Sequence, residues 1–306
     1  MKKTVYFVIA ALLLLGGIEY FLYKNLTTFI EGGHQDEVND PKDILLSSND
    51  INFEAEDGTN LFGWLIQGKP GFPAVIIAHK YGTNRSVTLL KLEGLITSLN
   101  KQGYYIFLFD FRGHGQSRGK SALGFKESDD VAAAMKALAK YKQISHRFAV
   151  LGVGMGAIAA AKAFNSVDEV KVLLLDSIYD DVAAKYTREI IHEWPFLAIS
   201  HPIMVKAVDL NLKQMLRIPT TDLNLPVQMS RLYPKAVVFI EKEPLSENVR
   251  ALYEAAREPK ELLHLPDTAA GELIGEARVT YNREVEEKIK KYLPPSSNEK
   301  TLDLPK

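Results

Sequence analysis

The sequence predicts an α/β fold in which a mostly parallel sheet lies between two layers of helices. Several short apolar runs are continuous rather than alternating, which is typical of strands that are covered on both faces. Stretches with helical periodicity separate these runs. Near the start, two alternating runs flank Asp57 and Gly58, a pair that favours the tight turn of a β-hairpin. The expected architecture is therefore an opening hairpin followed by alternating strands and helices.

Composition and charge exclude several classes of protein. The chain has 306 residues, 46% of them hydrophobic and 25% charged, which is ordinary for a globular protein and rules out collagen, coiled coil and a largely disordered chain. Lysine and arginine number 37 against 38 aspartate and glutamate, so we expect no nucleic acid partner. The absence of cysteine excludes disulfides, thiol nucleophiles and cysteinyl metal sites.

The N-terminal segment is predominantly apolar. Residues 4–23 carry one charge, Glu19, and as a helix they would extend roughly 30 Å, which is enough for the hydrocarbon core of a bilayer. Two lysines precede this segment and acidic residues follow it. We therefore expect residues 1–24 to form a single-pass membrane anchor, with the N-terminus cytoplasmic and the domain extracytoplasmic. The alternative is a cleaved signal peptide and a secreted domain, although no A-x-A cleavage site follows.

The remaining elements can be placed by residue number. Residues 25–43 are expected to be a linker, residues 44–293 the folded domain and residues 294–306 a disordered tail. The stretch 178–235 is rich in aromatic residues and proline and breaks the strand–helix alternation, which indicates an inserted cap. The expected strands are 51–56, 61–66, 74–79, 104–110, 148–152, 172–176, 236–240 and 261–265. The expected helices are 86–101, 128–140, 156–164, 248–257 and 282–292.

Two motifs carry a family resemblance. The segments FDFRGHGQSRG (109–119) and GVGMG (152–156) resemble the α/β-hydrolase superfamily, and in particular its serine-aminopeptidase and monoglyceride-lipase-like branch. The similarity extends from about Phe53 to Leu293. Some members of that branch carry one N-terminal membrane helix. The resemblance implies an α/β-hydrolase fold with a ligand pocket between the carboxyl edge of the sheet and the cap.

The nucleophile of such enzymes is missing. In the G-x-S-x-G elbow, serine lies on a strained turn from strand to helix, and the flanking glycines let the two elements approach closely. Here Gly152 and Gly156 keep the steric role, whereas Gly154 occupies the nucleophile position. Glycine has no oxygen with which to attack a carbonyl. If the alignment is wrong, then Ser117, Ser177 and Ser246 are the first serines to examine, since each falls at an expected turn.

The acid and base positions are also altered. The resemblance implies Glu243 as the acid, with Asp176 as the alternative. It aligns the usual histidine base with Ala270. His264 is the only histidine after Glu243, and it falls inside an expected strand rather than in the loop that follows, so it is a weak substitute.

The oxyanion loop departs from the pattern as well. Its usual His-Gly pair appears as His79 and Lys80, and together with Met155, which follows the elbow position, these residues are expected to line the pocket. Lys80 would block the pocket, bind an anion or point to solvent, and the sequence leaves these alternatives open. Arg112 and His114 are interpreted as structural.

These observations predict a pseudo-hydrolase that binds or scaffolds an unidentified small molecule, lipid or protein. The alternative is an active serine-type hydrolase of esters, lipids or peptides with unorthodox or misaligned catalytic groups. No histidine spacing indicates a metal site, and GVGMG lacks the spacing of a dinucleotide fingerprint, so we expect neither metal nor cofactor.

Overall fold

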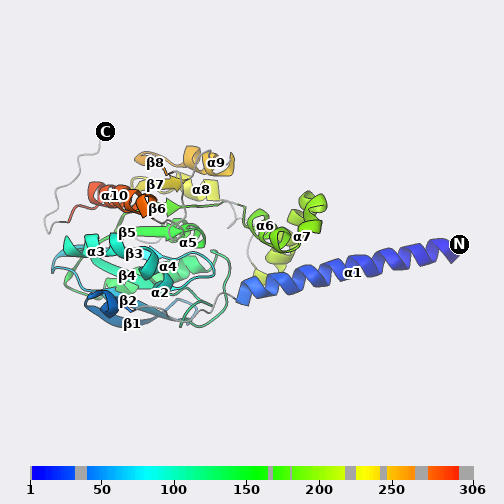
Figure 1. Ribbon diagram of the computed structural model, residues 1–306, viewed down its shortest axis with the longest axis horizontal. Coiled ribbons are helices and arrows are strands. Elements are labelled where there is room, and N and C mark those ends of the chain that lie inside the picture. Colours follow the sequence, from blue (N-terminus) through cyan, green and yellow to red (C-terminus); the bar gives the residue numbers. More distant parts are fainter. Residues whose placement is uncertain are drawn as a thin grey trace. The chain divides into compact units, whose positions relative to one another are not determined.

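The computed structural model describes most of the chain (Figure 1); the described residues are 2–31, 40–164, 168–179, 181–217, 225–241, 247–265 and 275–295. The chain divides into two compact units. The first comprises Met1–Glu31 and Asp181–Leu223, and the second comprises Gly32–Asp180 and Asn224–Lys306.

The second unit is built on an eight-stranded sheet with the order β1-β2-β4-β3-β5-β6-β7-β8. Its strands are β1 (Ser48–Glu54), β2 (Asn60–Ile66), β3 (Phe72–Ala78), β4 (Tyr105–Phe109), β5 (Ile144–Val153), β6 (Val170–Asp176), β7 (Ala236–Glu241) and β8 (Lys260–His264). β2 is antiparallel to both of its neighbours, and β3 to β8 are parallel to one another. The prediction of a mostly parallel sheet with an opening hairpin is confirmed.

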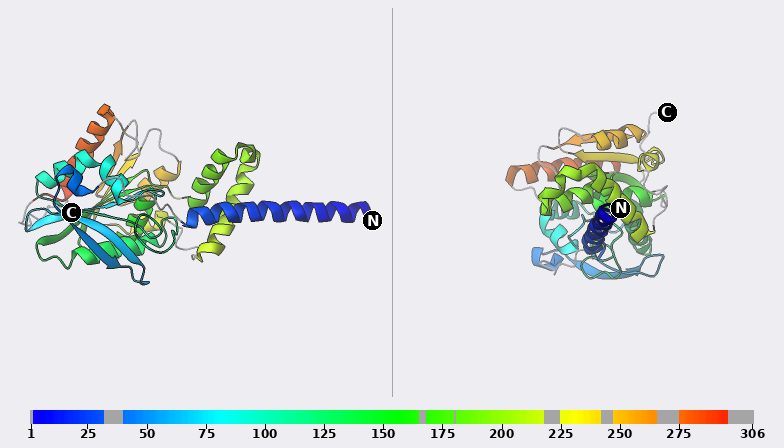
Figure 2. Two further views of the ribbon diagram at one scale, coloured as in Figure 1. Left: turned by 60° about the horizontal axis from the view of Figure 1, so that its bottom comes forward. Right: turned by 90° about the vertical axis from the view of Figure 1, so that its right-hand side faces the viewer.

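Helices cover both faces of this sheet (Figure 2). One layer contains α2 (Arg85–Lys91), α3 (Glu93–Lys101) and α10 (Gly275–Tyr292), and a continuous core lies between this layer and the sheet. The other layer contains α4 (Glu127–Leu138) and α5 (Met155–Ala163). The remaining described helices of this unit are η1 (Pro41–Ile44), α8 (Leu225–Ser230) and α9 (Glu247–Ala255). Burial on both faces explains why the strand sequences are continuously apolar.

The helix expected over 86–101 is broken into two. Asn84 caps α2 by accepting a hydrogen bond from the Val87 amide at 2.9 Å, so α2 begins where a capping residue allows. Leu92 then leaves the helical region, with φ −107° and ψ 17°, before α3 begins at Glu93. The break separates α2, which follows the loop after β3, from α3, which packs against α10.

The first unit is helical and consists of α1 (Lys2–Glu31), α6 (Val182–Glu193), η3 (Pro195–Ser200) and α7 (His201–Leu216). Aromatic contacts join α1 to the segment that the sequence predicts as a cap. The rings of Phe21 and Trp194 lie 5.6 Å apart, and those of Phe29 and Tyr186 lie 4.9 Å apart.

The predicted single-pass membrane anchor over residues 4–23, with a cytoplasmic N-terminus, is wrong. Within the described residues, no helix combines the length and the apolar character that a bilayer crossing requires. Glu19 and Lys24 interrupt the apolar residues of α1.

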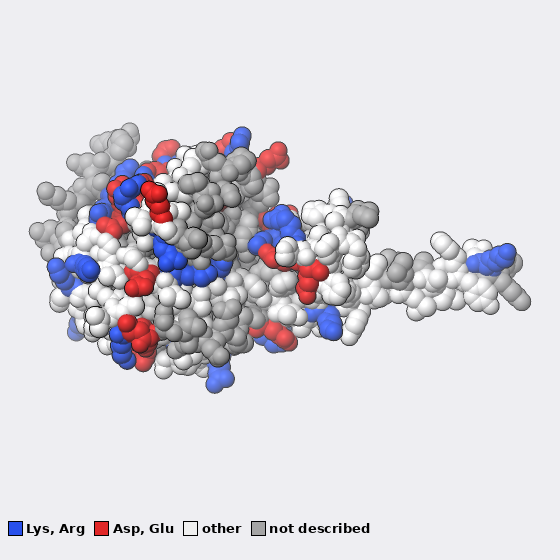
Figure 3. All heavy atoms as spheres, in the orientation of Figure 1, with Lys and Arg blue, Asp and Glu red and all other residues white. Residues whose placement is uncertain are grey.

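Charged side chains of both signs are interspersed on the face of the molecule that Figure 3 shows. Glu261 illustrates the pattern, because its carboxylate pairs with Lys288 at 2.6 Å and with Lys291 at 2.8 Å. This mixture matches the net charge of −1.

Candidate functional site

A tight turn from strand to helix lies at the carboxyl end of β5. Gly154 joins β5 to α5 with φ 54° and ψ −111°, a backbone conformation that side chains disfavour. A Cβ atom built on Gly152 would lie 2.5 Å from the carbonyl oxygen of Gly156, and one built on Gly156 would overlap the carbonyl oxygen of Ala78. Only glycine therefore allows β3, β5 and α5 to approach this closely.

Gly154 differs from its two neighbouring glycines because space surrounds it. A Cβ atom at this position would meet one side-chain atom, the Cβ of Lys80, at an ordinary 3.6 Å. The amide of Gly154 donates a hydrogen bond to the carbonyl oxygen of Asp176 at 2.8 Å, which ties the turn to the end of β6. This turn, the elbow, runs from strand to helix at positive φ, has room for a side chain at residue 154 and carries none.

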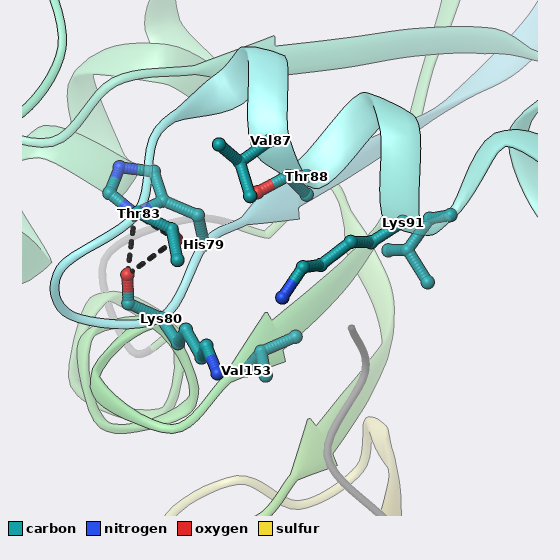
Figure 4. Close-up of a pocket in the computed structure, with 8 residues that line it drawn as sticks. His79, Lys80, Thr83, Val87, Thr88, Lys91 and Val153 are labelled. Atoms are coloured by element: carbon teal, nitrogen blue, oxygen red, sulfur yellow. Dashed lines mark hydrogen bonds between the residues drawn. The ribbon is translucent and has the colours of Figure 1, made fainter. Parts of the chain in front are cut away.

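Lys80 lies in the loop between β3 and α2 and lines a small cavity beside this turn (Figure 4). Its backbone carbonyl accepts hydrogen bonds from His79 Nδ1 at 2.8 Å and from the Thr83 hydroxyl at 2.9 Å, so the loop is fixed from within. In Figure 4 the side chains of Lys80 and of Lys91, which comes from α2, extend toward the same space. Lys91 was not predicted from the sequence. Thr88 and Lys91 both line the cavity, and their spacing of three residues places them on one face of α2.

His79 is buried and has a structural role. Its Nδ1 faces the Lys80 carbonyl, and its Nε2 accepts a hydrogen bond from the Phe111 amide at 3.0 Å, so both ring nitrogens are used. Burial, reinforced by neighbouring His114 and Arg85, lowers the pKa of His79 to about 3. The imidazole is therefore neutral at physiological pH and has no free nitrogen with which to take a proton.

Arg112 and His114 also hold the local fold. Arg112 is buried and forms ion pairs with Asp130 at 2.6 Å and with Asp57 at 2.7 Å. His114 Nδ1 lies 3.0 Å from the Arg112 carbonyl oxygen, and His114 Nε2 accepts a hydrogen bond from the Gly82 amide at 3.2 Å. These contacts join the loop after β4 to the loop after β3.

Acidic side chains meet at the carboxyl ends of β6 and β7. Asp176 is fully buried and accepts hydrogen bonds from the Tyr281 hydroxyl at 2.8 Å and from the Ser177 hydroxyl at 2.7 Å. Glu241 accepts a hydrogen bond from the Ile178 amide at 3.0 Å. Burial and the charge of Asp176 raise the pKa of Glu241 to about 8, so this carboxyl group holds a proton at neutral pH.

Glu241 and Tyr281 were not among the residues predicted from the sequence. Glu241 directly follows the apolar run of β7, and this position at a strand end was the available signal, but the alignment favoured Glu243 instead. Tyr281 gave no signal, because it reaches Asp176 from α10, more than a hundred residues further along the chain.

Of the other predicted site residues, those that the structure describes lie away from the elbow or are committed to other contacts. Glu243, Ser246 and Ala270 lie outside the described residues. His264 is exposed in β8, where it lies opposite Glu241 in the register with β7. β8 is the third strand from β5 in the sheet, and adjacent strands are about 4.8 Å apart. Met155, which was expected to line the pocket, is buried and is not among the described residues that line this cavity. Its sulfur lies 3.7 Å from the Ser121 hydroxyl. The hydroxyl of Ser117, also buried, donates to the Asp110 carbonyl.

Within the described part of the chain, no group of three histidine, aspartate or glutamate side chains is arranged to hold a metal ion.

Solved structures resemble this architecture closely. An esterase of Pyrococcus furiosus matches with a TM-score of 0.68 and 23% identity, over 87% of this chain and 98% of the esterase. The α/β hydrolase GrgF of a Penicillium species matches with a TM-score of 0.61 and 18% identity, over 81% of this chain and 99% of its own. The chain has an α/β-hydrolase fold. At these identities the likeness concerns the fold alone.

Sequence comparisons support the same superfamily. Residues 72–198 match the family described as serine aminopeptidase, S33. The uncharacterized protein YfhR of Escherichia coli (strain K12) is 27% identical over 146 residues, which is 45% of this chain and 49% of YfhR. The uncharacterized protein Rv2307c of Mycobacterium tuberculosis is 28% identical over 152 residues, which is 48% of this chain and 52% of that protein. The chain thus spans about half the length of the curated relatives it matches.

Proposed function

We propose that this chain is a catalytically inactive relative of the serine-aminopeptidase-like hydrolases, and that it binds a ligand at the carboxyl edge of its sheet instead of hydrolysing one. The observation that carries the proposal is Gly154. It holds the elbow conformation, has room for a side chain and has no oxygen to attack a carbonyl.

The surroundings of Gly154 support this proposal. The Cβ of Lys80 lies 3.6 Å from the place that a side chain at residue 154 would take, so a lysine stands beside the elbow where the family usually has glycine. His79 has both nitrogens in hydrogen bonds and a pKa of about 3, so it is unsuited to act as a base. His264 lies in β8, too far along the sheet to reach the elbow while that strand is intact.

The experiment combines a fluorophosphonate serine probe with hydrolysis of a short-chain nitrophenyl ester by the purified full chain. We expect neither labelling nor turnover above the uncatalysed rate, because residue 154 supplies no hydroxyl at the elbow. Stoichiometric labelling of one serine, with turnover that is lost when that serine is replaced, would overturn the proposal.

One observation favours an active hydrolase as the second candidate. Ser177 directly follows β6 with φ 53°, a strained conformation also found at nucleophile elbows, and its hydroxyl donates a hydrogen bond to Asp176. That partner is a carboxylate rather than an imidazole, which makes it a poor base for a serine. Probe labelling that disappears in Ser177→Ala would establish this second candidate.

A further inference from the structure

The chain leaves the sheet after β6 through a short stretch, residues 177–179, which we call the exit segment. Its first residue, Ser177, has φ 53°, a left-handed backbone conformation that a residue with a side chain disfavours. Its second residue, Ile178, is buried. The exit segment leads into the stretch 178–235 that the sequence predicts as a cap. A strained conformation at this place persists only while the surrounding contacts hold it.

Strand β7 holds the exit segment with two hydrogen bonds. The Ser177 amide donates to the Ile240 carbonyl at 3.0 Å, and the Ile178 amide donates to the Glu241 carboxyl at 3.0 Å. The first bond continues the ladder of β6 and β7, in which Asp176 pairs with Ile240. The second bond depends on a side chain, so it can break while the ladder stays intact.

The carboxyl group that makes the second bond has a like-charged neighbour. Glu241 ends β7 and is partly exposed, whereas Asp176 ends the adjacent β6 and is fully buried. Two carboxylates at neighbouring strand ends, poorly solvated, repel each other, which favours a proton on one of them. Burial and the charge of Asp176 accordingly raise the pKa of Glu241 to about 8.

Other titratable groups lie around this pair. Tyr281 of α10 donates its hydroxyl to Asp176, and burial together with that carboxylate raises the pKa of Tyr281 well above its ordinary value, so the phenol stays neutral. His264 of β8 lies opposite Glu241 in the register and is exposed. Helix α9 contacts β7 through an aromatic pair, and its charged side chains are all exposed, namely Glu247, Arg250 and Glu254. Water screens such exposed charges. Among the described groups, Asp176 is therefore the charge that acts on Glu241.

We propose that the Glu241 carboxyl is a pH-sensitive latch on the exit segment. With its proton, Glu241 accepts the Ile178 amide beside Asp176 and keeps the strained segment closed. When the proton is lost, the carboxylate moves away from Asp176 toward water, the Ile178 amide loses its acceptor, and the exit segment opens locally. The latch lies next to the elbow, because the Gly154 amide donates to the Asp176 carbonyl at 2.8 Å. The inference does not depend on whether the chain hydrolyses a substrate.

The test is hydrogen–deuterium exchange of the full chain, read at the amides of Ser177 and Ile178. The wild type and Glu241→Gln are compared at the same pH, so the intrinsic pH dependence of exchange cancels. Glutamine is neutral at every pH and keeps an acceptor for Ile178. Opening returns Glu241 to its ordinary pKa of 4.5, so the wild type opens more readily as pH rises toward the folded value of about 8. The ratio of wild-type to Glu241→Gln exchange rates should rise on the order of tenfold or more from about pH 6 to about pH 8, and then level off.

Two further variants frame this comparison. Glu241→Ala removes the acceptor altogether, so the Ile178 amide should exchange rapidly throughout this range. Glu254→Gln, an exposed change in α9, should follow the wild type at every pH. In the wild type at about pH 8, Ser177 and Ile178 should be at least about tenfold less protected than the central amides of β3, because the opening is local.

Three results would each overturn the inference. The first is a ratio of wild-type to Glu241→Gln exchange rates that does not change with pH. The second is equal protection of the exit segment and of β3, which would show that the segment opens only together with the whole sheet. The third is an Ile178 amide that exchanges as slowly in Glu241→Ala as in Glu241→Gln, which would show that the Glu241 carboxyl does not hold it.

Discussion

Glu241 and Asp176 lie at the carboxyl ends of adjacent parallel strands, and the charge of Asp176 adds to burial in raising the pKa of Glu241 to about 8. Asp176 accepts hydrogen bonds from the Tyr281 and Ser177 hydroxyls, whereas Glu241 accepts one from the Ile178 amide among the described residues. Burial and the neighbouring carboxylate of Asp176 favour the protonated form of Glu241, and the amide hydrogen bond from Ile178 opposes them only in part.

This relationship predicts a pH dependence of stability. Between the ordinary pKa of 4.5 and the folded value of about 8, the folded chain holds a proton on Glu241 that the unfolded chain has released. The free energy of unfolding should therefore fall as pH rises through this window, by on the order of a few kcal/mol. Glu241→Gln stays neutral and should flatten that slope in urea unfolding between about pH 5 and 9. Glu254→Gln, an exposed change in α9, serves as the control and should keep the wild-type slope.

The glycines of the elbow should differ in their tolerance of a side chain. Gly154→Ala has room for its methyl group and should cost about 1–3 kcal/mol, because of the positive φ alone. Gly152→Ala and Gly156→Ala place a Cβ against backbone atoms that cannot move aside, so each should cost more than about 3 kcal/mol. Denaturant unfolding measures all three. Equal losses at the three positions would contradict the close approach of α5 to β3 and β5.

Arg112 offers a comparison between a buried and an exposed partner. Asp130→Asn leaves the guanidinium without its buried carboxylate and should cost about 3–5 kcal/mol. Asp57 is 44% exposed, and Asp57→Asn should cost less than about 1 kcal/mol. The two free energies come from the same unfolding assay, and a reversal of their order would show that Asp57 is the main partner of Arg112.

Rebuilding the missing groups tests the alignment behind the proposed function. Gly154→Ser alone should remain nearly inactive toward a nitrophenyl ester, because an unassisted hydroxyl is a weak nucleophile. Gly154→Ser with Ala270→His should exceed the single variant by about 10²–10⁴-fold, the usual contribution of a positioned base. Adding Lys80→Gly should raise the rate further by clearing the oxyanion position. A thermal melt of each variant confirms folding, and wild-type turnover that His264→Ala abolishes would reject the alignment.

The sequence by itself determined the strands and most of the helices. Continuous apolar runs such as 74–79 and 172–176 are buried on both faces, and this local pattern directly reflects their place in a parallel sheet. The turn from strand to helix at Gly154 was expected from the resemblance of GVGMG to the G-x-S-x-G elbow. The apolar run at the N-terminus was misleading, because Glu19 and Lys24 interrupt it, and no helix among the described residues is long and apolar enough to cross a bilayer.

Only the tertiary structure decided which side chains meet. Lys91 joins Lys80 because α2 folds back over the loop after β3, and Tyr281 reaches Asp176 because α10 crosses the end of β6. The protonation of Glu241 and the neutrality of His79 depend on burial and on neighbours from other elements. Such properties arise from desolvation and from charges brought close by the fold, and sequence separation carries no information about either.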